Sequence, residues 1–261
     1  MPEHDDPADR RHRLERMRHA RASLPGELKS GAGRQQARGV HSRGYLPHVK
    51  VAGGTYFVTF RLNDSIPAGA VEQMRQEIEN EVLRERERWL IRKASSAARP
   101  SADPLPPDTA DEQQRDEFDS VHARHRAQFA VLDRWLDAGH GACWLRRPEV
   151  ATLVATALKF FVDDRYELKA WCVMPNHVHV VVRPAGRWAL SQILHSWKSF
   201  TAKEAAKVIG SEAPRDFWMP ESYDHWCRDE GEIVRCSRYT IMNPVKANFC
   251  REPKDWPWCS A

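Results

Sequence analysis

The chain has 261 residues, of which 41% are hydrophobic and 29% charged, with ten tryptophans and a formal net charge of +4. This composition predicts a hydrophobic core together with sizeable solvated segments, and the length suits one large domain with an added segment. There is no apolar run of about eighteen residues and no apolar N-terminal signal, so neither a membrane span nor secretion is expected. Six cysteines without a CxxC pair disfavour a zinc ribbon and suit the cytoplasm.

Basic residues are concentrated near the N-terminus. From Arg10 to Lys50 there are many arginines and lysines, and only Glu15 and Glu27 oppose them. We interpret residues 1–44 as a flexible basic arm, which predicts attraction to a polyanion and to nucleic acid above all. The candidate DNA contacts in this region are Arg34, Arg38, Arg43 and Lys50. The alternative is a tail that only increases solubility.

The predicted elements start with a strand over 53–62, in which Tyr56, Val58 and Phe60 alternate with Phe57, Thr59 and Arg61. Two helices with a Pro- and Ser-rich linker between them, over 68–93, 94–113 and 115–137, form an expected helical insertion at about 68–140. The remaining elements are a helix over 146–164, strands over 166–174 and 177–184, a helix over 188–210, a short strand within 216–229, and a helix over 230–242 that ends before Pro244.

Without the insertion, the order is strand, helix, strand, strand, helix, strand, helix. This order predicts an α+β fold for residues 45–261, with a ferredoxin-like or RRM-like antiparallel sheet and helices on one face. The first and third strands of that core should be central. The other face of the sheet is left for a ligand or for the last helix.

Two histidines interrupt the apolar strand over 177–184. Because strand side chains alternate, His177 and His179 should point to one face, and Val178 and Val180 to the other. This spacing can present two imidazoles to one metal ion. A hydrogen-bonded or solvent-facing pair is the alternative.

Tyr239 and Asn243 are four residues apart in the last predicted helix and therefore share a face. Asn243 precedes a proline, so we expect it at the frayed helix end. If this helix packs across the histidines, two imidazoles and an amide oxygen form an open site that suits Mg²⁺ or Mn²⁺, with room for phosphate oxygens. On the preceding helix, His195 and Lys198 share a face and are further candidate DNA contacts, with a solvated helix face as the alternative.

Several segments together resemble a known family. "VMPNHVHVVV" and "YDHWCRDEGEIVRCSRYTIMNPVKANF", with "GGTYFVTFRL", "ILHSWKSFTA" and "DWPWCSA", are similar to the single-tyrosine HUH transposases, and more narrowly to the bacterial REP-associated tyrosine transposases. The resemblance covers roughly 45–261. It implies that His177 and His179 bind the metal with Asn243 as third ligand, and that Tyr239 attacks single-stranded or hairpin DNA to form a 5′-phosphotyrosine. It assigns no role to the insertion.

Two other classes remain open. A non-catalytic RRM-like nucleic-acid binder would expose aromatic residues on its first and third strands, where this chain has histidines. An HUH replication initiator or relaxase commonly carries two tyrosines or a helicase domain, whereas the last helix has one tyrosine and the sequence has no Walker A motif. We expect a cytoplasmic, nucleoid-associated monomer or homodimer with no membrane partner.

Overall fold

The computed structural model describes residues 39–43, 46–51, 53–97, 124 and 126–261. The predicted arm up to residue 38, with Arg34 and Arg38, lies outside the described residues. The same holds for most of the predicted linker and for the start of the second predicted helix.

The strands are β1 (Gly39–Arg43), β2 (Leu46–Lys50), β3 (Thr55–Arg61), β4 (Tyr166–Val173), β5 (His177–Pro184) and β6 (Tyr223–Cys227). The helices are α2 (Val71–Ala97), α4 (Pro148–Lys159), α5 (Leu190–Ile209) and α6 (Glu230–Lys246), with short 3-10 helices η1 (Ala68–Ala70), η2 (Trp144–Arg146), η3 (Gly210–Glu212) and η4 (Pro253–Asp255). A further helical segment occupies residues 126–137. Over the described ranges, every helix is too short or too polar to cross a bilayer.

Four strands form an antiparallel sheet in the order β4-β5-β3-β6. The fold class is confirmed: the first and third strands of the core, β3 and β5, are central. β1 and β2 form a separate antiparallel hairpin that contacts β6 through β2. This hairpin differs from the predicted arm, because β1 falls within residues 1–44.

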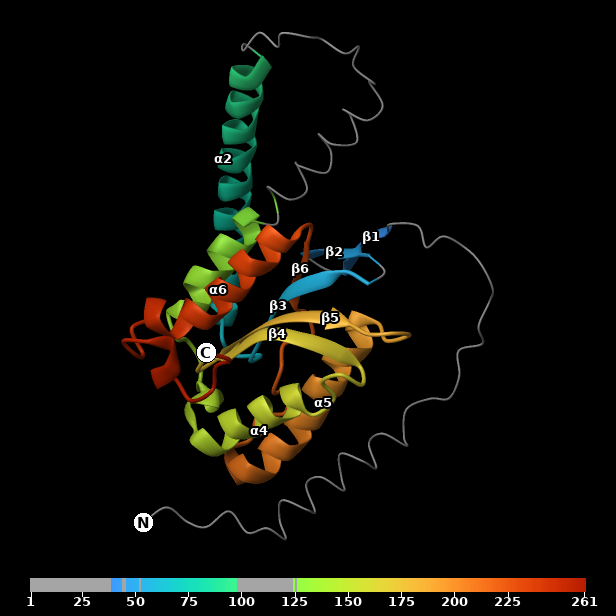
Figure 1. The fold of residues 1–261 in the computed structure, drawn as a ribbon. Helices are drawn as coiled ribbons and strands as arrows, with labels where there is room; N and C mark the ends of the chain where they lie inside the picture. Colours follow the sequence, from blue (N-terminus) through green and yellow to red (C-terminus); the bar gives the residue numbers. More distant parts are fainter. Residues whose placement is uncertain (1–38, 44–45, 52, 98–123, 125) are drawn as a thin grey trace. The chain divides into compact units, whose positions relative to one another are not determined.

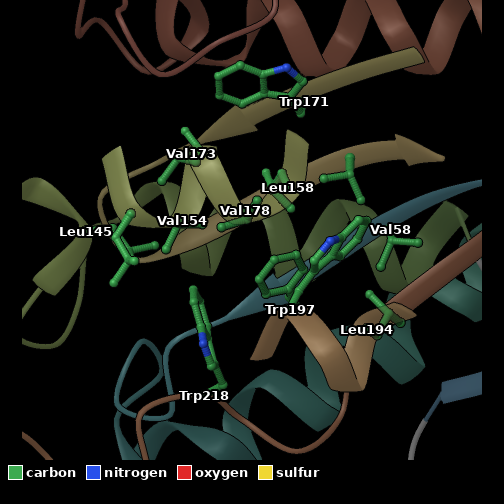
Figure 2. Packing of buried hydrophobic residues seen from close by; sticks show 14 of the residues in the cluster. Val58, Leu145, Val154, Leu158, Trp171, Val173, Val178, Leu194, Trp197 and Trp218 are labelled. Atoms are coloured by element: carbon green, nitrogen blue, oxygen red, sulfur yellow. The ribbon is translucent and has the colours of Figure 1, made fainter. Parts of the chain in front are cut away.

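The two faces of the sheet are covered by different helices. The larger core packs β3 and β5 against α4 and α5, and alternation sends Val58, Val178 and Val180 into it. Figure 2 shows side chains of the strands and of these helices, including Leu158 and Trp197, meeting in this layer. On the opposite face of the sheet lie α6 and the segment 126–137 (Figure 1). Their side chains pack over Phe57 and the histidines.

The predicted end of the last helix is wrong. α6 continues through Pro244 to Lys246. The proline removes the hydrogen bond that an N–H at position 244 would donate to the carbonyl oxygen of Thr240, and only two residues of the helix follow it. The backbone N–H groups of Ala247 and Phe249 close that end by donating to the carbonyl oxygens of Asn243 and Pro244, at 2.9 Å each.

Candidate active site

The fold brings His177 and His179 of β5 together with Tyr239 and Asn243 of α6. The rings of His179 and Tyr239 have centroids 5.5 Å apart. The Asn243 amide nitrogen donates to the Tyr239 hydroxyl at 3.0 Å. Asn243 is fully buried within α6 and does not lie at a frayed helix end, which corrects the predicted position. The shared face expected for these two helical residues is confirmed by their hydrogen bond.

The two imidazoles converge through their Nε2 atoms, which lie 3.0 Å apart. Both side chains are buried, and the strand alternation places them away from the valine core. Burial and the neighbouring imidazole hold the pKa of His177 well below its usual value. Burial, aided by the charge of Lys246, lowers the pKa of His179 to about 3. Both histidines are therefore neutral at ordinary pH, the state in which an imidazole can bind a cation.

The outer nitrogen of His177 is held by Asn176. The Asn176 amide nitrogen donates to the carbonyl oxygens of Leu136 and His140, at 3.1 and 3.3 Å. Its oxygen therefore faces His177 Nδ1, at 2.7 Å, as an acceptor. This arrangement assigns the proton to Nδ1 and leaves a lone pair on Nε2 of His177.

The outer nitrogen of His179 contacts the hydroxyl of Thr59 on β3, at 2.8 Å. A hydroxyl both donates and accepts, so Thr59 suits either tautomer of His179. Since His177 Nε2 carries no proton in this assignment, His179 Nε2 donates to it. A bound cation would need the other tautomer, and Thr59 can then accept from Nδ1.

The residues at this site fit a divalent cation. Asn243 Oδ1 is a buried oxygen without a hydrogen-bond partner in the described chain, although its own nitrogen bonds Tyr239. A buried unpaired amide oxygen is costly unless a cation or donor completes it. The described residues hold no group of three or more His, Cys, Asp and Glu side chains arranged for a metal. A cation held by the two imidazoles could take this amide oxygen as its third protein ligand.

Asp133, in the helical segment 126–137, also reaches this site. Its Oδ1 accepts a hydrogen bond from the Tyr239 hydroxyl and its Oδ2 pairs with the Lys246 ammonium. Oδ1 lies 4.0 Å from His179 Nε2. Burial raises the pKa of Tyr239, and so do the negative charge and hydrogen bond of Asp133. In this arrangement the phenol keeps its proton.

The other predicted DNA contacts are not part of this cluster. α5, which carries His195 and Lys198, packs on the opposite face of the sheet. The Lys198 ammonium donates to the carbonyl oxygens of Met219, Pro220 and Glu221 at 2.9, 3.1 and 3.4 Å, while His195 is exposed. Arg43 and Lys50 lie in β1 and β2. A DNA role for any of these residues stays a prediction.

Four residues of the cluster were not among the predicted site residues: Thr59, Asn176, Asp133 and Lys246. Lys246 had a sequence signal, because it follows Tyr239 by seven residues and so lies on the same helical face. Thr59 alternates with Phe60 on a strand that was predicted to be central. For Asp133, no local pattern links the insertion to the sheet.

Part of the chain matches a known protein family. Residues 148–227, from the start of α4 to the end of β6, match the family model described as Transposase IS200 like. That stretch contains His177 and His179, whereas Tyr239 and Asn243 lie beyond it. The resemblance predicted from the sequence is confirmed over this part of the chain.

Two curated relatives are described as REP-associated tyrosine transposases, one of them as putative. The REP-associated tyrosine transposase of Escherichia coli (strain K12) is 24% identical over 96 residues, which cover 37% of this chain and 54% of the relative. The putative REP-associated tyrosine transposase of Haemophilus influenzae (strain ATCC 51907 / DSM 11121 / KW20 / Rd) is 25% identical over 104 residues, covering 36% of this chain and 58% of the relative. The chain therefore spans little more than half the length of these relatives.

A solved structure is also similar. It is described as that of a REP-associated tyrosine transposase bound to a REP hairpin, and it is 16% identical with a TM-score of 0.38. The alignment covers 84% of this chain and 81% of that chain.

Proposed function

Since residues 148–227 match the family model of the IS200-like transposases, we propose that the protein is a metal-dependent endonuclease and strand-transferase for single-stranded DNA. The observation that carries this proposal is the position of Tyr239, whose ring packs against His179 and whose hydroxyl bonds Asn243. A helix-borne phenol beside two neutral imidazoles is a nucleophile next to a cation site. One tyrosine on this helix suits a single covalent intermediate.

In the proposed reaction, the Tyr239 oxygen attacks a DNA phosphorus and forms a new P–O bond. The bond from phosphorus to the 3′ oxygen breaks, the phenol proton is lost to water, and the leaving oxygen gains a proton as a free 3′-hydroxyl. The 5′ side of the DNA stays on Tyr239 as a phosphodiester, so the energy of the original ester is kept for rejoining and no ATP is needed.

His177, His179 and Asn243 would hold the metal. A bound Mg²⁺ or Mn²⁺ would withdraw charge from the phosphate. Asn176 and Thr59 keep the imidazole nitrogens aimed inward. Asn243 has a second task, because its amide nitrogen orients the Tyr239 hydroxyl.

The proposed substrate is a DNA hairpin of the REP type, as the resemblance of the sequence implies; both curated relatives are described as REP-associated. A purely binding RRM-like module has less support. Its nucleotides would stack on the open face of β3 and β5, and here α6 and the segment 126–137 cover that face.

The test is a covalent-adduct assay. Labelled REP-type hairpin oligonucleotides with single-stranded flanks, incubated with the protein and Mg²⁺ or Mn²⁺, should give an adduct that survives denaturation. Tyr239→Phe should abolish it, because the phenol oxygen is the attacking atom. Excess EDTA, His177→Ala and His179→Ala should each suppress it strongly.

Tyr223→Phe is the matched control. Tyr223 is a buried tyrosine in the same aromatic cluster, with its ring 6.2 Å from that of Phe57. This variant should still form the adduct. An adduct of undiminished yield with Tyr239→Phe would refute the assigned nucleophile, and full activity in EDTA would refute the metal.

A further inference from the structure

The side chain of Asp133 is buried at the point where a reacting phosphate would have to lie. It is 5% exposed and comes from the insertion, outside the strands and helices of the ferredoxin-like core. One carboxylate oxygen bonds the Tyr239 hydroxyl, the other pairs with Lys246, and the first lies 4.0 Å from His179 Nε2. The carboxylate thus contacts the nucleophile and a cation, and it lies beside the imidazole pair.

A phosphodiester in the proposed reaction needs these same neighbours. Its phosphorus must approach the Tyr239 oxygen, and its non-bridging oxygens need positive charge around them. Carboxylate and phosphate both present paired anionic oxygens, and lysine binds either as a point charge. Two anions cannot share one buried position, because their repulsion is strong where water is excluded. Asp133 must therefore leave Tyr239 and Lys246 before DNA can react.

Lys246 is placed to exchange one anion for the other. It lies at the end of α6 with its side chain 49% exposed, and it also pairs with Asp137 at 3.0 Å. Its ammonium lies 5.5 Å from the centre of the Tyr239 ring. The cation can therefore be reached from solvent while it stays beside the nucleophile.

We propose that Lys246 binds the scissile phosphate and that Asp133 occupies the place of this phosphate until DNA displaces it. The inference rests on the proposed function and adds a phosphate-binding residue and a self-blocking contact to it. It also gives the insertion a task, because the segment 126–137 carries the blocking group. That segment is held to α2 by contacts from Arg134 and Trp135 to Glu77, at 3.3 and 3.2 Å.

Two other roles for Asp133 make opposite predictions. As a general base, it would take the phenol proton, and its removal would slow the chemistry. As a metal ligand, it would strengthen Mn²⁺ binding, and its removal would weaken it. As a phosphate substitute, its removal should strengthen DNA binding and leave metal affinity within about twofold.

The decisive experiment is a double-mutant cycle on DNA binding without chemistry. In a Tyr239→Phe background, a fluorescent REP-type hairpin oligonucleotide with single-stranded flanks is titrated in Mn²⁺ against four proteins: the background, Asp133→Asn, Lys246→Met and the double variant. Asp133→Asn should tighten binding about tenfold, the usual size of a charged hydrogen-bond effect. With Lys246→Met present, the gain should fall below about twofold, because the freed cation is gone.

Matched controls separate this effect from bulk charge and from folding. Asp137→Asn removes a negative charge from the same helical segment and from the same ammonium, whereas the hydrogen bond of the Tyr239 hydroxyl goes to Asp133. An equal gain with Asp137→Asn would overturn the proposal. Lys246→Arg keeps the charge and should restore most of the binding lost in Lys246→Met. Because Lys246 is half-exposed, its two variants give a result even if Asp133→Asn is poorly folded.

Adduct formation with Tyr239 intact completes the test. Asp133→Asn should form the adduct about tenfold faster than the unaltered chain. Slower adduct formation would show a general base, and weaker Mn²⁺ binding by calorimetry would show a metal ligand; either result overturns the proposal. If no protein forms an adduct but the binding cycle shows the gain, the proposed chemistry fails and the phosphate site stands. If adducts form but Asp133→Asn does not bind the hairpin more tightly, the proposed chemistry stands and the phosphate site at Lys246 fails.

Discussion

The two faces of the central sheet differ in how their buried polar groups are satisfied. On the face covered by α4 and α5, two buried tryptophans have paired indole groups: Trp197 Nε1 donates to the Tyr166 hydroxyl at 2.9 Å, and Trp218 Nε1 donates to Thr201 at 2.8 Å. On the face covered by α6, the sheet carries neutral histidines with lowered pKa values, and Asn243 has an unpaired buried oxygen. One face stabilises the fold, whereas the other tolerates unfavourable burial where the proposed chemistry takes place.

The largest change in the free energy of unfolding should come from the face covered by α4 and α5, called here the stabilising face. Trp197→Ala should lower the free energy of unfolding by about 3–5 kcal/mol, because it leaves a cavity beside Phe60 and Tyr166 and removes the hydrogen bond that the Tyr166 hydroxyl accepts. Urea denaturation followed by circular dichroism measures it. Val208→Ala, an exposed change on the same helix, should stay within about 0.5 kcal/mol. A loss below about 1 kcal/mol for Trp197→Ala would contradict the division between the faces.

The second effect is a pH dependence that originates on the other face. The folded pKa values of His177 and His179 lie below the ordinary 6.5, so below that pH the unfolded chain takes up protons that the folded chain does not. The stability is therefore present above about pH 6.5 and is lost as the pH falls, by up to about 1.4 kcal/mol per pH unit for each histidine. His179→Gln should make the fall of unfolding free energy between pH 6.5 and 5 shallower.

The control for that slope is His195→Gln, at an exposed position of α5. It should leave the pH dependence as steep as in the unaltered chain. If the free energy of unfolding fell equally steeply with pH in the unaltered chain and in His179→Gln, His179 would not cause the acid sensitivity.

The smallest effect should follow from Asn243→Leu. The change removes the bond to Tyr239 at 3.0 Å but also removes a buried oxygen that has no partner in the described structure. The two consequences oppose each other, so the free energy of unfolding should change by less than about 1 kcal/mol in either direction. Metal binding, measured by calorimetry with Mn²⁺, should be lost.

The contrast for this variant is Thr201→Val on the stabilising face. It leaves Trp218 Nε1 buried without its partner and should cost about 1–3 kcal/mol. If Asn243→Leu were as costly as Thr201→Val, the site face would be no less optimised for stability than the other.

Most of the core could be predicted because its signals are local. Alternation along β3 and β5 and the helical spacing in α4 depend on near neighbours in the chain, and the structure confirms which side each residue faces. The His177–His179 pair followed from a period of two. Tyr239 and Asn243 followed from a spacing of four.

The rest depended on contacts between distant segments. Asp133 reaches Tyr239 across more than a hundred residues, through an insertion whose register with the sheet no local pattern records. Pro244 predicts a helix end by a local rule, but α6 continues two residues beyond it and is closed by the N–H groups of Ala247 and Phe249. The role of Asn176 required knowledge of the carbonyl groups of Leu136 and His140.

The junction between Asp64 and Gly141 has a consequence for how such a chain can diversify. Ala142 N donates to Asp64 Oδ2 at 2.8 Å, and a Cβ on Gly141, where φ is +84°, would lie 2.5 Å from the Asp64 carbonyl oxygen. The 76 residues between these points leave and rejoin the sheet at this contact. The last part of the excursion also supports the site, because Asp133 bonds Tyr239 and the carbonyl groups of Leu136 and His140 hold Asn176. Since lengthening a loop with fixed ends costs little free energy, the number of residues between α2 and residue 126 could change while the sheet that carries the histidines keeps these contacts.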